Sequence, residues 1–465
     1  MMRKNIKELF FPALTVILPF LLQPFMSIAY SDSESISFSG SFRTRGEFRD
    51  NLDMNSAQND SFSFVNMRFR FGPTIKIGDN IELKGTLQDS RIFGKAASLL
   101  SQDAPLEGVN FTATNSRNLE SLDIIEGLAL LKKSFENFQI NAAIGRQRLA
   151  YGEHRILGTF DWSNVSNSFD GIKISGIHSV FRTDFLAFII RENSVAEGAA
   201  EIPQPKRNKV SLLGVYNSFN LPGKNNLDIY LLSLLDGARV NYAGVGFENY
   251  KREVSKDAFI FASGLRFSGE RQIENFTPFV VFEGVYEFGR AWADKLNSFA
   301  ISGRIGTKMS PLKARVFVEY DLAQGTTQKD RQNGIRRTFY NFFPTNHIHY
   351  GYADLFSWKN MHGLRLGTGL VPFEKISLSF DFWKFWLYTN EDWWYNAGQL
   401  VFLKDKLPYP SRDAGTEFDI ILEAEPVKSL KVESGYSIFF PGELPRKLGK
   451  NDPMHWVYLQ IFINF

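Results

Sequence analysis

Two stretches near the N-terminus carry arginine at every second position. Arg43 and Arg45 lie in the first stretch and Arg68 and Arg70 in the second, each pair separated by one residue. Because successive side chains of a β-strand point to opposite faces, each pair shares one face of its strand. The guanidinium group stays charged at any accessible pH and binds carboxylates through two parallel hydrogen bonds. The spacing therefore predicts recognition of anions along a strand.

Further basic side chains lie in or beside similar stretches, and acidic side chains accompany them. Rings of basic residues favour anions in a channel, whereas any wide water-filled barrel also needs a charged lining in which the charges are paired. For a single residue both interpretations stay open. The candidate pore-lining residues are Arg43, Arg45, Arg68, Arg70, Arg146, Arg148, Arg155, Lys173, Arg266, Arg304, Arg315, Arg365, Glu47, Asp170, Glu283 and Glu319.

Signals for enzymatic or metal chemistry are weak. The chain has no GxGxxG, GxxxxGK[ST] or GxSxG motif, and its carboxylates are too numerous for a pair of them to indicate glycoside cleavage. His347 and His349 are the nearest approach to a metal pair, with Asp354 close by, but a convincing third ligand is missing. The absence of cysteine excludes disulfides and cysteine nucleophiles. We therefore expect no enzymatic activity, no cofactor and no metal.

The composition limits the class of protein. The 465 residues include 53 Lys and Arg against 50 Asp and Glu, a formal net charge of +3, which argues against nucleic-acid binding through bulk electrostatics. Aromatic residues make up 15% of the chain, yet the mean hydropathy is −0.19. A chain that is rich in Phe but polar on average must interleave the two kinds of residue, as a sheet with one apolar and one wet face does.

The arginines belong to a series of stretches in which apolar and polar residues alternate. Most have 10–15 residues, enough to cross a hydrocarbon layer at a tilt, and short turns alternate with long polar connections between them. Because every backbone polar group in lipid needs a partner, such a sheet must close. We predict a single all-β, antiparallel transmembrane barrel of about 18 strands, with short periplasmic turns, long extracellular loops and a lumen too wide for strand side chains to fill. The eighteen stretches begin near residues 36, 62, 80, 122, 137, 168, 180, 208, 225, 257, 276, 298, 312, 360, 374, 413, 428 and 454.

Both ends of the chain have features of an exported protein. Basic residues precede an uncharged stretch from Leu9 to Ala29, which predicts a signal peptide cleaved after Ala29 and a barrel over residues 30–465; a transmembrane anchor is the alternative. The C-terminal stretch alternates and ends on Phe465. Bacterial outer-membrane proteins usually present such an end to their insertion machinery, so we expect this machinery and outer-membrane lipid as partners.

Several segments carry a more specific resemblance. Residues 145–155 read GRQRLAYGEHR, followed by DWSNV at 161–165 and SFDG at 168–171. Residues 342–347 read FFPTNH, followed by YGYADLF at 350–356 and WKN at 358–360, with WWYNAG at 393–398 and FFPG at 439–442. From about residue 40 to the C-terminus, the chain resembles the alginate-export family of outer-membrane porins.

The resemblance implies a monomeric 18-stranded barrel with a basic, constricted lumen that passes alginate, a polyuronate. It implies matching arginines at Arg43, Arg68, Arg146, Arg148 and Arg155, and acids at Asp161, Asp170 and Asp354 that order loops or line the mouth.

The leading hypothesis is passive export of an anionic polysaccharide across a bacterial outer membrane, with no nucleic-acid partner. A general or substrate-specific uptake porin for small anions or nutrients is the second hypothesis. A barrel enzyme or adhesin that uses the long loops is the third.

Overall fold

The computed structural model describes residues 34–57, 60–94, 120–192, 209–236, 258–291, 294–310 and 312–465. The predicted signal peptide lies outside these residues. The described strands form one sheet: β1 (Glu34–Asp50), β2 (Phe62–Ile77), β3 (Ile81–Gly94), β4 (Glu120–Ser134), β5 (Phe138–Gln147), β6 (Phe169–His178), β7 (Phe181–Glu192), β8 (Lys209–Leu221), β9 (Lys224–Asp236), β10 (Ala258–Glu270), β11 (Phe276–Ala291), β12 (Asp294–Met309), β13 (Ala314–Ala323), β14 (Ile335–Arg336), β15 (Met361–Phe373), β16 (Ile376–Leu387), β17 (Asp413–Val427), β18 (Leu430–Pro441) and β19 (Met454–Asn464).

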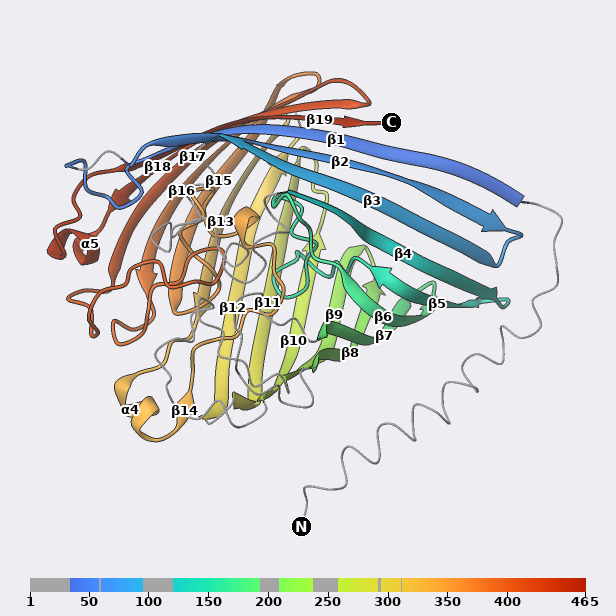
Figure 1. Cartoon of the computed structure of the whole chain (residues 1–465), viewed down its shortest axis with the longest axis horizontal. Coiled ribbons are helices and arrows are strands. Elements are labelled where there is room, and N and C mark those ends of the chain that lie inside the picture. Colours follow the sequence, from blue (N-terminus) through green and yellow to red (C-terminus); the bar gives the residue numbers. More distant parts are fainter. Residues whose placement is uncertain are drawn as a thin grey trace, which may run out of the picture.

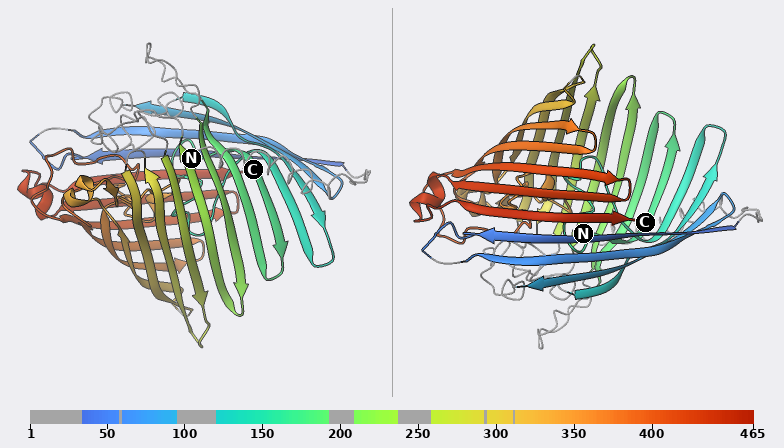
Figure 2. Two further views of the ribbon diagram at one scale, coloured as in Figure 1. Left: turned by 90° about the horizontal axis from the view of Figure 1, so that it is seen from below. Right: turned by 90° about the horizontal axis from the view of Figure 1, so that it is seen from above.

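The sheet closes on itself into a barrel (Figures 1 and 2). Each long strand pairs in antiparallel fashion with the long strands before and after it, and β1 pairs with both β2 and β19, so that Gly46 faces Val65 on one side and Leu459 on the other. The two-residue β14 lies within a connection and pairs with β12 alone, in parallel. Within the described residues, eighteen long strands thus form the wall, which confirms the predicted fold, and no predicted start differs from the observed one by more than four residues.

The connections differ between the two ends of the barrel. At one end, the turn end, neighbouring strands are separated by few residues, such as 374–375 and 428–429. At the other, the loop end, connections run over 148–168 and 324–360. The loop end has one exception, since β11 and β12 are joined by residues 292–293 alone. Among the described residues, three short helices also lie at connections: α4 (Gln328–Gln332), η3 (Asn346–Ile348) and α5 (Glu443–Lys447).

None of the helices in the described part of the chain has the length and apolar character needed to span a membrane.

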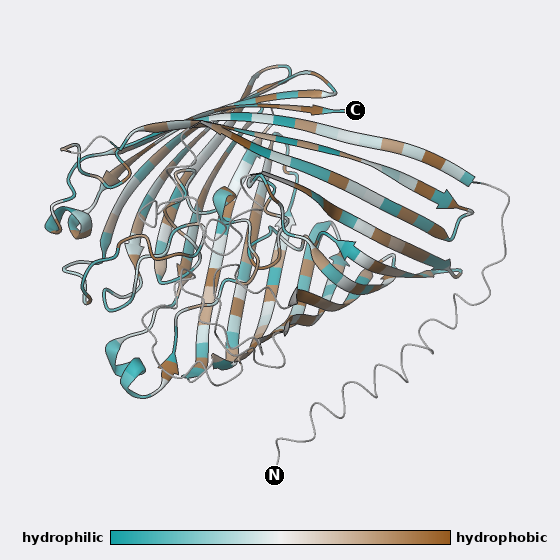
Figure 3. Ribbon diagram, viewed as in Figure 1, coloured by the Kyte–Doolittle hydropathy of each residue, from teal (hydrophilic) through white to brown (hydrophobic). Residues whose placement is uncertain are grey.

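Polar and apolar residues alternate along the strands (Figure 3). The alternation gives the wall an apolar outer face and a polar inner face, as the exposure of the side chains shows. In β2, Phe69 is 41% exposed, whereas the neighbouring Arg68 is 3% exposed. In β11, Phe282 is 41% exposed and Glu283 is 4% exposed. Exposed aromatics beside buried charges are the reverse of a water-soluble protein. They are what an outer face in lipid requires.

Loop residues form a packed core inside the barrel near the loop end. Trp358 and Tyr350 of the β13–β15 connection and Trp394 of the β16–β17 connection are fully buried, in one cluster with Leu149 and Leu157 of the β5–β6 connection. The strand side chains do not fill the interior themselves, as their number predicts. Near this end, three connections fold inward and occupy part of the interior.

Candidate functional site

The connection between β5 and β6, residues 148–168, crosses the barrel interior; we call it the lumenal strap. At residues 161–164 it accepts hydrogen bonds from arginines of β1 and β2. At Arg155 the strap is ion-paired with Glu319 of β13. Around the wall, β13 lies six strand pairings away from β1. The strap is therefore attached to two distant parts of the barrel wall. It narrows any path through the barrel.

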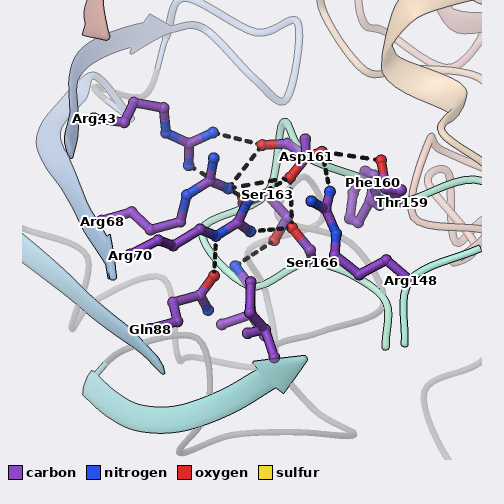
Figure 4. A network of polar contacts seen from close by, with 12 residues as sticks. Arg43, Arg68, Arg70, Gln88, Arg148, Thr159, Phe160, Asp161, Ser163 and Ser166 are labelled. Carbon is purple, nitrogen blue, oxygen red and sulfur yellow. Dashed lines mark hydrogen bonds and ion pairs between the residues drawn. The ribbon is translucent and has the colours of Figure 1, made fainter. Parts of the chain in front are cut away.

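The first attachment is made by arginine side chains and main-chain carbonyls (Figure 4). Arg43 donates hydrogen bonds to the carbonyl oxygens of Asp161, Trp162 and Ser163, at 2.6, 3.0 and 3.1 Å. Arg68 donates to the carbonyl oxygens of Asp161 and Ser163, both at 3.0 Å. The strap thus offers these arginines oxygen acceptors, the same atoms that a carboxylate would offer.

The Asp161 carboxylate lies among the same guanidinium groups. It accepts hydrogen bonds from Arg70, at 2.9 Å, and from Arg148, and it lies 3.8 Å from Arg68. Although burial alone would raise it, the positive charges of Arg148, Arg70 and Arg68 hold the pKa of Asp161 well below its usual value. We call Arg43, Arg68, Arg70 and Arg148 the arginine cluster. Four cations around one carboxylate leave this side of the lumen positive.

A stack of flat side chains continues from the arginine cluster into the interior. The Arg45 guanidinium lies 3.7 Å from the ring centroid of Trp162, and that ring stacks on His347 at 3.8 Å. Glu47 accepts a hydrogen bond from Arg45 at 2.8 Å, and Asp354 hydrogen-bonds the His347 ring at 2.8 Å. Through these contacts the strap is held against β1 and against the β13–β15 connection.

The second attachment consists of buried acidic and basic side chains. The Arg155 side chain is 1% exposed and contacts Glu319, while Asp321 lies 3.1 Å away; both acids are fully buried. Arg304 binds the same Glu319 carboxylate at 2.6 Å, and the Tyr350 hydroxyl lies 3.0 Å from Arg155. We call Arg155, Arg304, Glu319 and Asp321 the buried ion-pair cluster. Mutual charge pairing is the condition under which charges tolerate such burial.

The β13–β15 connection packs on the strap as a second layer. The backbone N–H of Gly158 donates to the carbonyl of Phe343 at 2.7 Å, and that of Thr345 donates to the carbonyl of His154 at 2.9 Å. Leu157 and Phe343 form an isolated parallel bridge. These backbone bonds place the strap and the connection in one unit.

The two histidines that resemble a metal pair have separate partners. His347 is bonded to Asp354, whereas His349 hydrogen-bonds the Glu153 carbonyl at 2.6 Å. Burial, with the positive charge of Arg155, lowers the pKa of His349 well below its usual value, so this ring is neutral. Within the described residues, no group of three or more His, Asp or Glu is arranged to hold a metal ion.

Most of the other predicted residues lie on the inner face. Lys173 pairs in register with Ala143 and Leu186, which are both buried. The inward acids and bases contact one another or a tyrosine: Arg266 with Asp228 at 3.2 Å, Arg365 with Asp381 at 2.6 Å, and Glu283 with the Tyr230 hydroxyl at 2.7 Å.

Arg315 differs from the other inward arginines. Its guanidinium lies 5.0 Å from the ring centroid of Phe317, a ring that Arg304 and Arg365 also approach. In the part of the chain that the structure describes, no carboxylate forms an ion pair with Arg315. It lies near the turn end of β13, one residue from where that strand begins.

Arg146 and Asp170 are a correction to the predicted pore lining. In β5, Arg146 has the same strand parity as Ile144, which is 38% exposed, and in β6 Asp170 has the same parity as Ile172. The two residues face each other in register and form an ion pair at 2.7 Å. They therefore lie on the outer face near the loop end, because one residue of strand decides which face a side chain takes.

Sequence reasoning missed the atoms that accept hydrogen bonds from the arginines. The carbonyls at residues 161–163 and the side chain of Asn164, which accepts from Arg43 at 2.9 Å, do the binding. Every residue has a carbonyl, so no composition signal marks these three. The DWSNV segment carries the resemblance, but its residue types do not show that the strap turns inward.

The comparisons with known proteins agree with this architecture. The family model described as alginate export matches residues 34–455. This chain belongs to the alginate export family. No curated protein matches it.

Solved structures show the same fold. The chain is similar to OccK2 (OpdF) of Pseudomonas aeruginosa, solved in complex with glucuronate, with a TM-score of 0.57 and 10% identity over 93% of this chain and 96% of that one. It is also similar to OpdK of the same organism, with a TM-score of 0.57 and 7% identity over 94% and 100% of the two chains. OprD, also of this organism, gives 0.54 and 9% identity over 92% and 93%. Family and fold together identify an outer-membrane channel rather than an enzyme.

Proposed function

We propose that this channel passively exports an acidic polysaccharide of the polyuronate class, with the arginine cluster as its anion-selecting site. Membership of the alginate export family supports the substrate class. The observation that carries the proposal is the set of hydrogen bonds from Arg43 and Arg68 to the carbonyl oxygens of Asp161 and Ser163. Guanidinium groups already aimed at oxygen acceptors within the lumen need little rearrangement to bind a carboxylate.

The strap makes this binding exchangeable. A carboxylate accepts two parallel hydrogen bonds from one guanidinium and adds an attraction between opposite charges, so a uronate carboxylate competes well with a neutral carbonyl. When the carboxylate moves on, the carbonyls take back the arginines, and no buried cation is left unsatisfied. Such exchange favours passage from one uronate residue to the next over trapping of the chain.

Arg315 offers a second contact for the same ligand, nearer the turn end. Because turn ends of outer-membrane barrels face the periplasm, an exported chain meets Arg315 before it reaches the strap. The guanidinium already lies against the Phe317 ring and carries no described ion pair, so it is available to a carboxylate. We assign it the first capture of the polyanion.

Uptake of small anions is the competing function. The packed connections inside the barrel leave less room than an open lumen does. OccK2, which shares this fold at 10% identity, was solved with glucuronate, a single uronic acid. A monomer-sized ligand would suit a narrowed lumen, so the experiment has to compare ligand lengths.

Planar-bilayer recording of the purified channel tests the proposal. We expect anion preference, and current blockade by oligouronates that neutral oligosaccharides of equal length do not cause. The double variant Arg43→Gln with Arg68→Gln, and separately Arg315→Gln, should weaken both properties. Arg146→Gln is the matched control, because Arg146 lies on the outer face with its own carboxylate partner.

The outcomes separate the hypotheses. Cation preference, or unchanged selectivity in both the double variant and Arg315→Gln, would contradict the proposed site. Blockade that strengthens with oligouronate length supports polysaccharide passage. Equal blockade by glucuronate and by longer chains supports the uptake of small anions instead.

A further inference from the structure

Aromatic side chains gather on the outer face of the wall at the loop end of β13, β15 and β16. Tyr320 of β13 is exposed and has the strand parity of Val318, which is exposed as well. The Tyr320 hydroxyl lies 2.7 Å from Nδ1 of His362 in β15, and the His362 ring stacks on that of Tyr388 at 5.5 Å. Trp386 of β16 pairs in register with His362 and shares its face. We call these four residues the rim aromatic group: Tyr320, His362, Trp386 and Tyr388.

Toward the turn end, the outward residues that follow this group are apolar. Val318 pairs in register with Leu366 of β15, and Leu366 pairs with Phe382 of β16. Val318 and Leu366 are both exposed on the wall. Amphipathic rings at the edge of an apolar band are typical of the level where hydrocarbon meets lipid headgroups. Because long connections of such barrels face the outside of the cell, the rim aromatic group lies at the outer-leaflet interface.

Arg412 of the β16–β17 connection brings a cation to this group. The backbone N–H of Leu387 donates to the Arg412 carbonyl, and Nε of Arg412 donates to the Leu387 carbonyl, both at 2.8 Å. Arg412 is exposed, and its positive charge acts on the Tyr320 hydroxyl and on the His362 ring. Since both of those groups point outward, the guanidinium lies on the lipid side of the wall rather than in the lumen.

The acid next to Arg412 in the chain is engaged elsewhere. Asp413 forms an ion pair with Lys384, and its second carboxylate oxygen accepts from the backbone N–H of Glu443 at 3.3 Å. Across the described ranges, no carboxylate forms an ion pair with Arg412, and Nε is its one guanidinium nitrogen with a hydrogen bond. The two terminal nitrogens are therefore open to a ligand from outside the chain.

We propose that Arg412 binds the phosphate group of a phosphorylated lipid in the outer leaflet. A guanidinium suits this ligand, because two parallel N–H groups match two phosphate oxygens. The position selects a lipid over soluble phosphate, since acyl chains attached to the headgroup would cover Val318 and Leu366. Lys384, whose ammonium lies 5.6 Å from the ring centroid of Trp386, adds a second cation at the same level. Basic groups at a membrane surface attract anionic lipids in this way.

Lipid binding to the full-length barrel in detergent tests the site. The probe is diphosphoryl lipid A, read by native mass spectrometry, with lipid A stripped of both phosphates and inorganic phosphate as comparison ligands. We expect Arg412→Gln to weaken binding about fivefold, which corresponds to about 1 kcal/mol for one charge. Arg146→Gln is the matched control, since Arg146 is an outward cation near the loop end that already has an acid partner.

Two further variants sharpen the test. Arg412→Lys keeps the charge but loses the paired N–H groups, so it should retain part of the affinity. Asp413→Asn removes the negative charge that occupies Lys384 and should strengthen binding. Heat-modified gel mobility shows whether each barrel has formed.

Several outcomes would overturn the proposal. Unchanged binding in Arg412→Gln would exclude the site, and so would equal binding of the lipid that lacks phosphate. Displacement of the lipid by inorganic phosphate at equal concentration would point to a free-anion site instead. Weaker binding in Asp413→Asn would assign the contact to the acid rather than to the cation. Channel selectivity should be unchanged in Arg412→Gln, which separates this site from the arginine cluster.

Discussion

The two attachments of the lumenal strap differ in what the arginines bind. At β1 and β2, Arg43 and Arg68 reach neutral carbonyls of the strap. At β13, the strap's own Arg155 reaches two buried carboxylates, Glu319 and Asp321. The two donor arginines are similarly buried, since Arg43 is 3% and Arg155 is 1% exposed. The difference between these two donors therefore lies in the charge of the acceptor rather than in their own burial.

That difference assigns different tasks to similar side chains. A neutral acceptor is readily replaced by a charged ligand, whereas a buried carboxylate holds its arginine because separation would leave two uncompensated charges. The β1–β2 attachment can exchange partners during conduction, and the β13 attachment keeps the strap in place. Counting arginines in the lumen would overlook this distinction.

The largest expected effect comes from removing the fixed attachment. Arg155→Met leaves Asp321 buried without its guanidinium, while Glu319 keeps Arg304, so we expect a loss of about 3–5 kcal/mol in the free energy of unfolding. Arg43→Met, the matched change at the other attachment, removes a cation from among like charges and should cost only about 1 kcal/mol. Urea unfolding of the barrel in detergent, followed by tryptophan fluorescence, measures both.

Equal losses of unfolding free energy in the two variants would contradict this distinction, since both attachments would then be structural. A selectivity loss in Arg155→Met without destabilisation would reverse the roles assigned here.

A smaller and more specific effect is expected at Asp161. Asp161→Asn keeps the shape of the side chain but removes the negative charge that Arg70 and Arg148 share. We expect a stability loss of about 1.5–3 kcal/mol, the usual range for hydrogen bonds to charged groups. At the same time the anion preference, measured as the reversal potential in a salt gradient, should rise. Asp170→Asn, which alters an outward acid, should leave the reversal potential as it is.

The wall of the barrel is predictable from the sequence because alternation is a local property. Lipid outside and water inside require a change of polarity at each residue, so Phe69 and Arg68 reveal their faces without knowledge of the fold. The same reasoning failed at Arg146 and Asp170. There the strands end near the membrane edge, where charged pairs are tolerated on the outer face. At this level the polarity of a residue no longer indicates whether its side chain points into the lumen or outward.

The inward strap could not be predicted in the same way. Its position depends on contacts between residues far apart in the chain, such as Arg43 with Ser163 and Arg155 with Glu319. A long polar connection is equally compatible with an external loop. Non-glycine residues in left-handed backbone, at His154 with φ 65° and Phe160 with φ 51°, shape the strap but leave no mark in the composition.

The smallest effect, taken per pH unit, comes from a buried lysine in the β13–β15 connection, close to the fixed attachment. Lys359 belongs to the connection that also supplies Tyr350 to Arg155, and its ammonium lies 4.6 Å from the ring centroid of Tyr395. Burial, reinforced by the positive charge of Arg336, lowers the pKa of Lys359 to about 7. Between that value and the ordinary lysine pKa, the unfolded chain holds a proton that the folded chain lacks. Unfolding then takes up a proton, so stability rises with pH over this interval, by at most about 1.4 kcal/mol per unit.

Urea midpoints in detergent between about pH 7.5 and 9.5 should therefore increase with pH, and Lys359→Met should flatten the increase. Asp161→Asn is the control at the exchangeable attachment. Because the pKa of Asp161 is lowered from an already acidic value, this group does not titrate in the interval, and its variant should keep the wild-type slope. A slope that survives in Lys359→Met would assign the titration to another group. The pH response would then no longer distinguish the fixed attachment from the exchangeable one.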